Sequence, residues 1–198
     1  MLTNIAVLVS GGGTNLQALI DAQAAGKLKS GKITLVASHN PKAYALERAK
    51  NAGIDTLVIE GREGFEDKLI RALDEKNIDL IILAGFMRIL SENFTRRYPR
   101  RIINVHPALI PSFCGNGYYG LRVHEEALKY GVKVTGATVH FVNEVTDGGE
   151  IILQKAVPVR KNDTPEILQR RVMEKAEWLL LPRAAELVSR EIIKEKNK

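Results

Sequence analysis

The sequence predicts an α/β fold, with a Rossmann-like, mostly parallel sheet, helices on both of its faces and an antiparallel hairpin near the C-terminus. In the first two-thirds of the chain, short apolar segments alternate with amphipathic segments of helical length. Strands separated by helices in this way pair in parallel through right-handed crossovers. Two long β-type segments follow at residues 133–143 and 150–159, joined by Asp147-Gly148-Gly149, which predicts the hairpin.

The elements of the parallel part can be assigned in chain order. Residues 4–10 are apolar almost throughout, as expected for a strand buried on both faces. Gly26 and Gly53 are placed to close the first two helices, and Ser91 is a suitable N-cap for a short fourth helix. We therefore predict strands over residues 4–10, 32–38, 55–59, 79–84 and 101–106, and helices over residues 14–25, 42–52, 65–76 and 91–97.

The pattern changes after Pro107, which has no N–H to continue a strand. Residues 107–121 form a long predicted loop, and the aromatic side chains within it argue against disorder. After the hairpin, residues 163–166 offer an N-cap, an early proline and an acidic residue, so a helix should begin there. Pro182 is expected to break or kink that helix. We predict one domain over residues 1–198.

Composition argues against several classes of protein. The formal net charge is +6, but the basic residues are dispersed or gathered in the last turns, without interleaved aromatics, so we expect no nucleic acid partner. A basic solvated surface is the simplest explanation, and a small anionic substrate the next. We expect no membrane span, no signal peptide and no zinc site, because none of their sequence patterns occurs. The single cysteine, Cys114, agrees with a reducing cytoplasm.

The most informative polar residues are Asn104 and His106, at the end of the otherwise apolar segment 101–106. Side chains alternate along a strand, so these two project on the same side, about 7 Å apart at ~3.3 Å per residue. Open α/β sheets bind their ligands at the carboxyl ends of their strands. We hypothesise a reactive site there; a polar pair that only satisfies loop backbone groups is the alternative.

A second candidate site is the turn Ser10-Gly11-Gly12-Gly13-Thr14-Asn15, between the first strand and the first helix. Its glycines allow close approach of a ligand, and the N–H groups that open the helix favour an anion. The pattern matches neither G-x-G-x-x-G nor G-x-x-x-x-G-K-[ST], so it does not indicate a dinucleotide or a nucleoside triphosphate. A phosphate group is the ligand that we expect, with a plain tight turn as the alternative.

Asp147 suits the hairpin turn, because aspartate accepts local N–H bonds. If the hairpin folds over the carboxyl edge of the sheet, Asp147 would also reach His106, favour its charged ring and raise its pKa. An amide, a cationic imidazole and a carboxylate suit attack on a carbonyl group, and no convincing nucleophile lies beside them, so direct transfer is favoured. His39 and His124 are expected to be non-catalytic, and His140 to be a core residue or a pocket wall.

Several motifs resemble those of one known family. In chain order they are N-I-A-V-L-V-S-G-G-G-T-N-L-Q-A-L-I, L-A-G-F-M-R-I-L-S, I-N-V-H-P-A-L-I-P-S-F and H-F-V-N-E-V-T-D-G-G-E-I-I-L-Q. Their order and spacing resemble the phosphoribosylglycinamide formyltransferases, folate-dependent enzymes of purine biosynthesis, from about Asn4 to Pro182. The resemblance implies the formyltransferase fold, 10-formyltetrahydrofolate as co-substrate and no metal.

The resemblance also implies site residues. The family's formyl-transfer site falls on Asn104, His106 and Asp147. Its phosphate loop falls on Gly13, Thr14 and Asn15, and a glutamate that meets the glycinamide amine falls on Glu177. Its folate pocket falls on Met87, Arg88, Ile89, Leu90 and Asn104, together with Arg62.

The implied reaction transfers a formyl group to the amine of 5′-phosphoribosylglycinamide through a tetrahedral intermediate. Methionyl-tRNA formyltransferase and formyltetrahydrofolate deformylase would keep the donor and change the acceptor, and each is expected to need a further domain. A non-catalytic nucleotide-binding module, using only the glycine turn, is the alternative from another class. The expected partners are small molecules, and the expected state is a monomer or homodimer.

Overall fold

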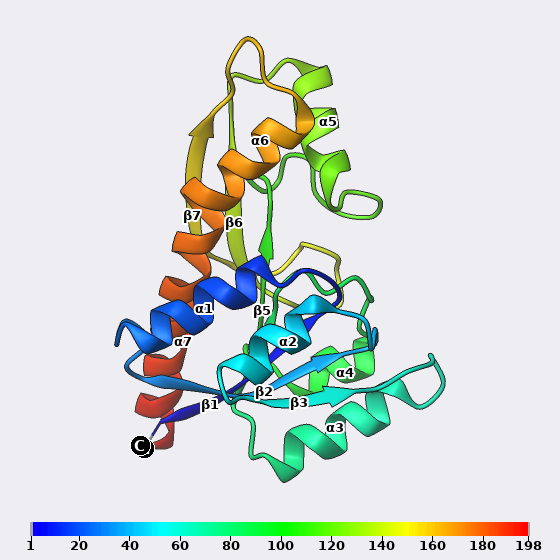
Figure 1. Ribbon diagram of the computed structural model, residues 1–198, viewed down its shortest axis with the longest axis vertical. Helices are drawn as coiled ribbons and strands as arrows, with labels where there is room; N and C mark the ends of the chain where they lie inside the picture. The colour runs from blue at the N-terminus through cyan, green and yellow to red at the C-terminus, as the bar shows by residue number, and fades with distance from the viewer. Residues whose placement is uncertain (1, 198) are drawn as a thin grey trace.

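The computed structural model describes residues 2–197, which form a seven-stranded sheet in the order β3-β2-β1-β4-β5-β6-β7 (Figure 1). The parallel strands are β1 (Thr3–Val9), β2 (Gly31–Ser38), β3 (Asp55–Val58), β4 (Leu80–Leu83) and β5 (Ile102–His106). β6 (Val134–Phe141) runs antiparallel to β5, and β7 (Ile151–Pro158) runs antiparallel to β6. The predicted mostly parallel sheet with a C-terminal hairpin is confirmed.

The helices alternate with the strands as predicted. They are α1 (Thr14–Ala24), α2 (Tyr44–Asn51), α3 (Phe65–Glu75), α4 (Glu92–Arg97), α5 (Leu121–Tyr130), α6 (Pro165–Val172) and α7 (Trp178–Lys196). A π-helical segment, η1 (Met173–Glu177), joins α6 to α7, so that the three form one path beside the sheet (Figure 1). No helix within residues 2–197 is long and apolar enough to cross a membrane.

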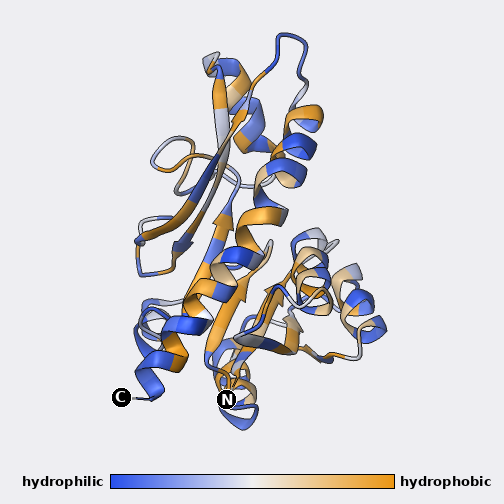
Figure 2. Cartoon of the chain, turned by 90° about the vertical axis from the view of Figure 1, so that its left-hand side faces the viewer, coloured by the Kyte–Doolittle hydropathy of each residue, from blue (hydrophilic) through white to orange (hydrophobic). Residues whose placement is uncertain are grey.

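Helices cover both faces of the sheet, because β1 sends alternate side chains into two apolar cores. Ile5 and Val7 belong to the core that includes side chains of α1, α2, α6 and α7. Ala6 and Leu8 belong to the other core, which includes side chains of α3 and α4. Figure 2 shows the apolar colour concentrated along the strands between these layers. The near-continuous apolar sequence of the first strand follows from this burial on both sides.

The predicted helix ends agree with the local backbone. Gly26 and Gly53 have φ values of 66° and 67°, in the left-handed region that glycine adopts without a steric penalty. Ser91 caps α4 by accepting a hydrogen bond from the N–H of Phe94, as predicted. Thr164 caps α6 in the same way, with Pro165 at the first turn.

Of the predicted break or kink at Pro182, the break is wrong. α7 continues through Pro182 to Lys196, and the irregular segment lies before it, in η1. A proline removes only the hydrogen bond of its own N–H and crowds the preceding turn. The widened turn of η1 lies immediately N-terminal to α7, and α7 then runs on without interruption. Such π-helical turns occur often at functional sites.

Candidate active site

The carboxyl end of β5 places Asn104 and His106 beside β6. The antiparallel register puts Asn104 opposite His140 and His106 opposite Thr138. The Nδ2 atom of Asn104 lies 3.2 Å from Nε2 of His140. His106 and His140 are both buried, at 4% and 1% exposure. The strand end therefore holds two imidazoles and one amide in one buried group.

Asp147 approaches both imidazoles from the segment between β6 and β7. One carboxylate oxygen lies 3.5 Å from Nδ1 of His106, and the other lies 3.5 Å from Nε2 of His140. The backbone N–H of Gly115 donates to the same carboxylate at 2.8 Å. The structure thus brings His106 and Asp147 together, and it adds His140 as a second neighbour of the carboxylate.

The charge state of the histidine differs from the expected one. Burial lowers the pKa of His106, and it outweighs the opposing influence of the Asp147 charge and of the Phe113 carbonyl. The expectation that Asp147 raises the pKa of His106 above its usual value is therefore wrong. Burial alone would raise the pKa of Asp147, but its contacts with His140, His106 and Gly115 together lower it. These shifts favour an ionised carboxylate at Asp147 and a neutral ring at His106.

The long loop after β5 contacts the imidazole directly. The Nε2 atom of His106 lies 2.8 Å from the carbonyl oxygen of Phe113. A carbonyl oxygen can only accept, so this nitrogen carries a proton, and in the neutral ring Nδ1 is unprotonated. His106 therefore presents an N–H at Nε2, which is the form required to stabilise a negative oxygen.

The glycine turn leads into α1 as predicted. Thr14 and Asn15 open the helix, and the side-chain amide of Asn15 donates to Glu177 at 2.7 Å. Gly13 has a φ of 73° and lies against α2, where an added Cβ would come within 2.5 Å of the Cβ of Ala45. The turn and α2 can approach this closely only because residue 13 is a glycine.

Replacing Gly13 by alanine should lower the free energy of unfolding by about 2 kcal/mol, because the left-handed backbone and the contact with Ala45 both resist a Cβ. Gly26 is the matched control, since it also has a positive φ but nothing within 4 Å of an added Cβ. Gly26→Ala should lose about 1 kcal/mol. Urea unfolding of the two variants measures the difference, and equal losses would show that the Ala45 contact is unimportant.

Glu177 is buried at 7% exposure at the end of η1. Burial raises the pKa of its carboxyl group to about 7, and the hydrogen bond from Asn15 opposes that shift. Glu177 can therefore exchange a proton near neutral pH. Its hydrogen bond from Asn15 holds it beside the first turn of α1, so a ligand held by the glycine turn would be close to this carboxyl group.

The segment after β4 supplies an apolar wall. The backbone N–H of Met87 donates to the Ser10 hydroxyl at 2.8 Å, which ties this segment to the glycine turn. Arg88 donates to the carbonyl of Gly61 at 2.6 Å and lies over the ring of Phe65. Met87 and Ile89 are exposed, so their side chains offer an apolar surface to a ligand.

These residues line one cleft of about 640 Å³, a size suited to small molecules. From the predicted site it includes Thr14, Asn15, Met87, Arg88, Ile89, Leu90, Asn104, His106, Asp147 and Glu177. Gly13 and Arg62 are not among its lining residues. Within residues 2–197, no group of three or more His, Cys, Asp and Glu side chains is arranged to hold a metal ion.

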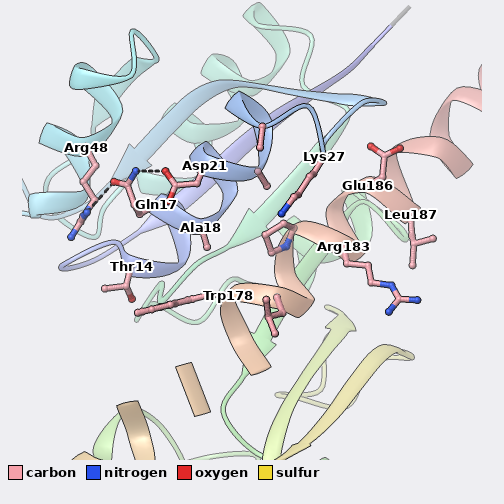
Figure 3. A pocket seen from close by; sticks show the side chains of 14 residues that line it. Thr14, Gln17, Ala18, Asp21, Lys27, Arg48, Trp178, Arg183, Glu186 and Leu187 are labelled. Carbon is pink, nitrogen blue, oxygen red and sulfur yellow. Dashed lines mark hydrogen bonds between the residues drawn. The ribbon is translucent and has the colours of Figure 1, made fainter. Parts of the chain in front are cut away.

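A second groove, of about 690 Å³, lies between α1 and α7 (Figure 3). Its lining includes Trp178, Arg183 and Glu186 from the helical side and Thr14 from the start of α1. Neither the Asn104 and His106 pair nor Asp147 borders it. The reactive groups therefore belong to the smaller cleft, and Thr14 lines both.

The sequence interpretation placed His140 as a core residue or a pocket wall, and it is buried and lines the cleft, but its two polar contacts were not predicted. Its contacts with Asn104 and Asp147 depend on the register of β5 against β6, which residue spacing does not reveal. The one available signal was that His140 precedes the hairpin turn and shares a strand face with Thr138. His124 lines the cleft, and burial lowers its pKa to about 4, so it stays neutral. His39 lies outside the group.

Residues 3–184 match the family model described as "Formyl transferase". The chain therefore belongs to the formyl transferase family. Within that family it is similar to the phosphoribosylglycinamide formyltransferase of Escherichia coli (strain K12), with 43% identity over 174 residues, 85% of this chain and 79% of that protein.

Two further relatives show the same likeness. The trifunctional purine biosynthetic protein adenosine-3 of Homo sapiens is 45% identical over 190 residues, which are 93% of this chain but only 18% of that protein. The chain thus spans less than a fifth of the length of that relative. The crystal structure of glycinamide ribonucleotide transformylase 1 from Symbiobacterium toebii has a TM-score of 0.88 and 41% identity, over 96% of this chain and 89% of that one.

Proposed function

We propose that this chain transfers the formyl group of 10-formyltetrahydrofolate to the amine of 5′-phosphoribosylglycinamide, giving formylglycinamide ribonucleotide and tetrahydrofolate in purine biosynthesis. The names of its relatives support this reaction. The observation that carries it is the cleft itself, which joins a helix N-terminus, a buried acid, an amide–imidazole–carboxylate group and an apolar wall. We propose that residues 1–198 act as one domain.

The proposed binding roles follow from the chemistry of each part. The N–H groups at the start of α1, with Thr14 and Asn15, suit the phosphate of the acceptor. Glu177 would receive a hydrogen bond from the acceptor amine. The apolar wall at Met87 and Ile89 suits the flat ring system of a folate, and Arg62, outside the cleft lining, would contact only the distal part of the donor.

The proposed transfer begins when the neutral amine attacks the formyl carbon. A C–N bond forms, the carbonyl electrons move to oxygen, and the tetrahedral intermediate carries a negative oxygen. Asn104 and the Nε2–H of His106 would donate to that oxygen. The carbonyl of Phe113 accepts from the same N–H in this structure, so it would give way to the formyl group. A proton then passes from the attacking nitrogen to the folate nitrogen as the old C–N bond breaks, through water held by Asp147.

The proposed partners are small molecules, without nucleic acid or membrane. Every group in the proposed reaction comes from one chain, so a monomer or a homodimer could act. The cytoplasm is the proposed compartment. The single cysteine and the similarity to metabolic enzymes support it.

An assay with three acceptor conditions tests this function. The protein is mixed with 10-formyltetrahydrofolate and either phosphoribosylglycinamide, methionyl-tRNA or no acceptor, and the folate absorbance is followed. Turnover only with phosphoribosylglycinamide is expected. Donor breakdown without acceptor would indicate a deformylase, transfer to methionyl-tRNA would indicate that other formyltransferase, and no turnover would favour a binding module.

Trp178 offers a direct measure of acceptor binding, because it is the chain's single tryptophan and follows Glu177. Figure 3 shows it beside Thr14, at the opening of α1. Phosphoribosylglycinamide should therefore change the tryptophan fluorescence in a saturable way. The dephosphorylated acceptor should bind about tenfold more weakly or worse, because it lacks the charge-assisted hydrogen bonds at the helix N-terminus. Equal affinities would contradict the phosphate assignment of the glycine turn.

A further inference from the structure

His140 makes contacts that determine its protonated nitrogen. Its Nδ1 atom lies 2.8 Å from the carbonyl oxygen of Phe141. Because a carbonyl only accepts, Nδ1 must carry a proton. In the neutral ring, Nε2 then has a free lone pair and can only accept. The atom 3.2 Å from Nε2 is the amide nitrogen of Asn104, which donates.

This contact orients the amide. An asparagine side chain can place either its oxygen or its nitrogen toward a given neighbour, and the hydrogen-bond network decides between them. A neutral, Nδ1-protonated His140 accepts one N–H of Asn104, so the second N–H of the same nitrogen stays free. Asn104 lines the cleft, and its free N–H is available to a carbonyl oxygen there.

Asp147 and Asn104 both lie near Nε2 of His140. The carboxylate of Asp147 lies 3.5 Å from Nε2 of His140 and 3.5 Å from Nδ1 of His106. A protonated His140 would donate to Asp147 and present an N–H to the Asn104 nitrogen, which cannot accept it. Two cationic rings beside one carboxylate would also repel each other in a buried site. The hydrogen bond from Asn104 therefore requires a free lone pair at Nε2 of His140.

The backbone around His140 also supports a specific placement. The pairing of β6 with β7 shifts register between Val139 and His140, so that Val139 faces Leu153 while His140 faces Ile151. Such irregularities bend a strand and re-aim a side chain, and they are common next to active sites. On its other edge, β6 keeps a regular register that sets His140 directly opposite Asn104.

We propose that His140 is a positioning residue, which as the neutral Nδ1–H tautomer accepts a hydrogen bond from Asn104 and so aims the other N–H of that amide at the formyl oxygen. This inference rests on the proposed function. It assigns His140 no contact with substrate. Its effect on the reaction passes through Asn104.

Two matched substitutions test the proposal. In His140→Gln the side-chain oxygen can reach about the position of Nε2, so Asn104 keeps its acceptor. In His140→Asn the shorter side chain reaches about the position of Nδ1 and leaves Asn104 without it. We expect His140→Gln to keep kcat within about threefold of the parent and His140→Asn to lose about tenfold, the worth of one neutral hydrogen bond, with KM for both substrates little changed. Equal losses in the two variants, at similar thermal stability, would overturn the proposal.

A double-mutant cycle identifies the route of the effect. Asn104→Ala should lower kcat by ~10²-fold, and adding His140→Asn to it should cost less than about twofold more. A full additional tenfold loss would show that His140 acts through Asp147 or through the fold. If the unchanged protein transfers no formyl group, the proposed function itself fails, whatever the variants do.

A spectroscopic readout does not depend on turnover. Two-bond proton–nitrogen correlations of protein labelled with ¹⁵N-histidine distinguish the two neutral tautomers, and His140→Gln identifies the signal of this ring. The Nδ1–H tautomer is expected at neutral pH. The Nε2–H tautomer or a protonated ring would refute the orientation that we assign to Asn104.

Discussion

Replacing Asp147 by asparagine should lower kcat for formyl transfer by ~10²-fold or more, with the fold intact. The carboxylate lies 3.5 Å from His106 and 3.5 Å from His140, and it accepts from the Gly115 N–H. The introduced amide would keep the size of the side chain but remove the charge that supports a proton on His106 during transfer. Steady-state kinetics at saturating concentrations of both substrates measures the loss.

Glu150 provides the control for that variant. It is a carboxylate close to Asp147 in sequence, but it is exposed and pairs with Arg100 at the surface. Glu150→Gln should change kcat by less than about twofold, because exposed ion pairs contribute little. Near-normal turnover in Asp147→Asn would remove the role that we assign to the carboxylate.

Replacing Glu177 by glutamine should stabilise the protein at high pH and inactivate it at the same time. In the folded chain the carboxyl pKa is about 7, against a reference value of 4.5. Between these two values the folded state binds a proton that the unfolded state has released, so the wild-type protein loses stability as pH rises from about 4.5 to about 7, and the loss levels off above that. A shift of this size corresponds to about 3 kcal/mol above pH 7, in favour of the uncharged variant.

Urea unfolding at pH 3.5 and at pH 8 tests the sign of this effect. Below the unfolded pKa both proteins carry an uncharged side chain, so their stabilities should agree there. Glu191→Gln, on an exposed part of α7, should match the parent at both pH values. A stability gain for Glu177→Gln that is the same at both pH values would mean that packing, and not ionisation, causes it.

The cost of burying Glu177 fits a functional role. A carboxyl group that destabilises the fold near neutral pH would be replaced by an uncharged residue if stability alone were at issue. Its position beside Asn15, where α1 begins, is where the proposed acceptor amine would bind. The widened turn of η1 places Met173 and Glu177 together in the cleft lining.

Local sequence patterns predicted much of the architecture. The alternation of apolar and amphipathic segments predicted the parallel strands and the helices between them, and Ser91 and the glycines marked helix ends that the structure confirms. The polar pair Asn104 and His106 was visible because an amide and an imidazole interrupt an apolar strand. These features depend on neighbours in sequence, which is why the chain alone reveals them.

Contacts between distant segments could not be read in this way. Pro182 indicated a break or a kink, but α7 continues through it, and the irregular turn lies before α7, in η1. The resemblance implied Arg62 and Arg88 as folate contacts, and of these two residues only Arg88 lines the cleft. The pKa of His106 was expected to rise beside Asp147, but the burial of the ring has the larger effect.

The sequence by itself determined which elements form, which strand end carries reactive side chains and which turn can receive an anion, because hydrophobic period, caps and glycines act over a few residues. Only the tertiary structure decided that His140 faces Asn104 and that Asp147 lies between two imidazoles. Strand register and burial arise from the packing of segments that are far apart in the chain. They set the charge and the orientation of each group in the cleft.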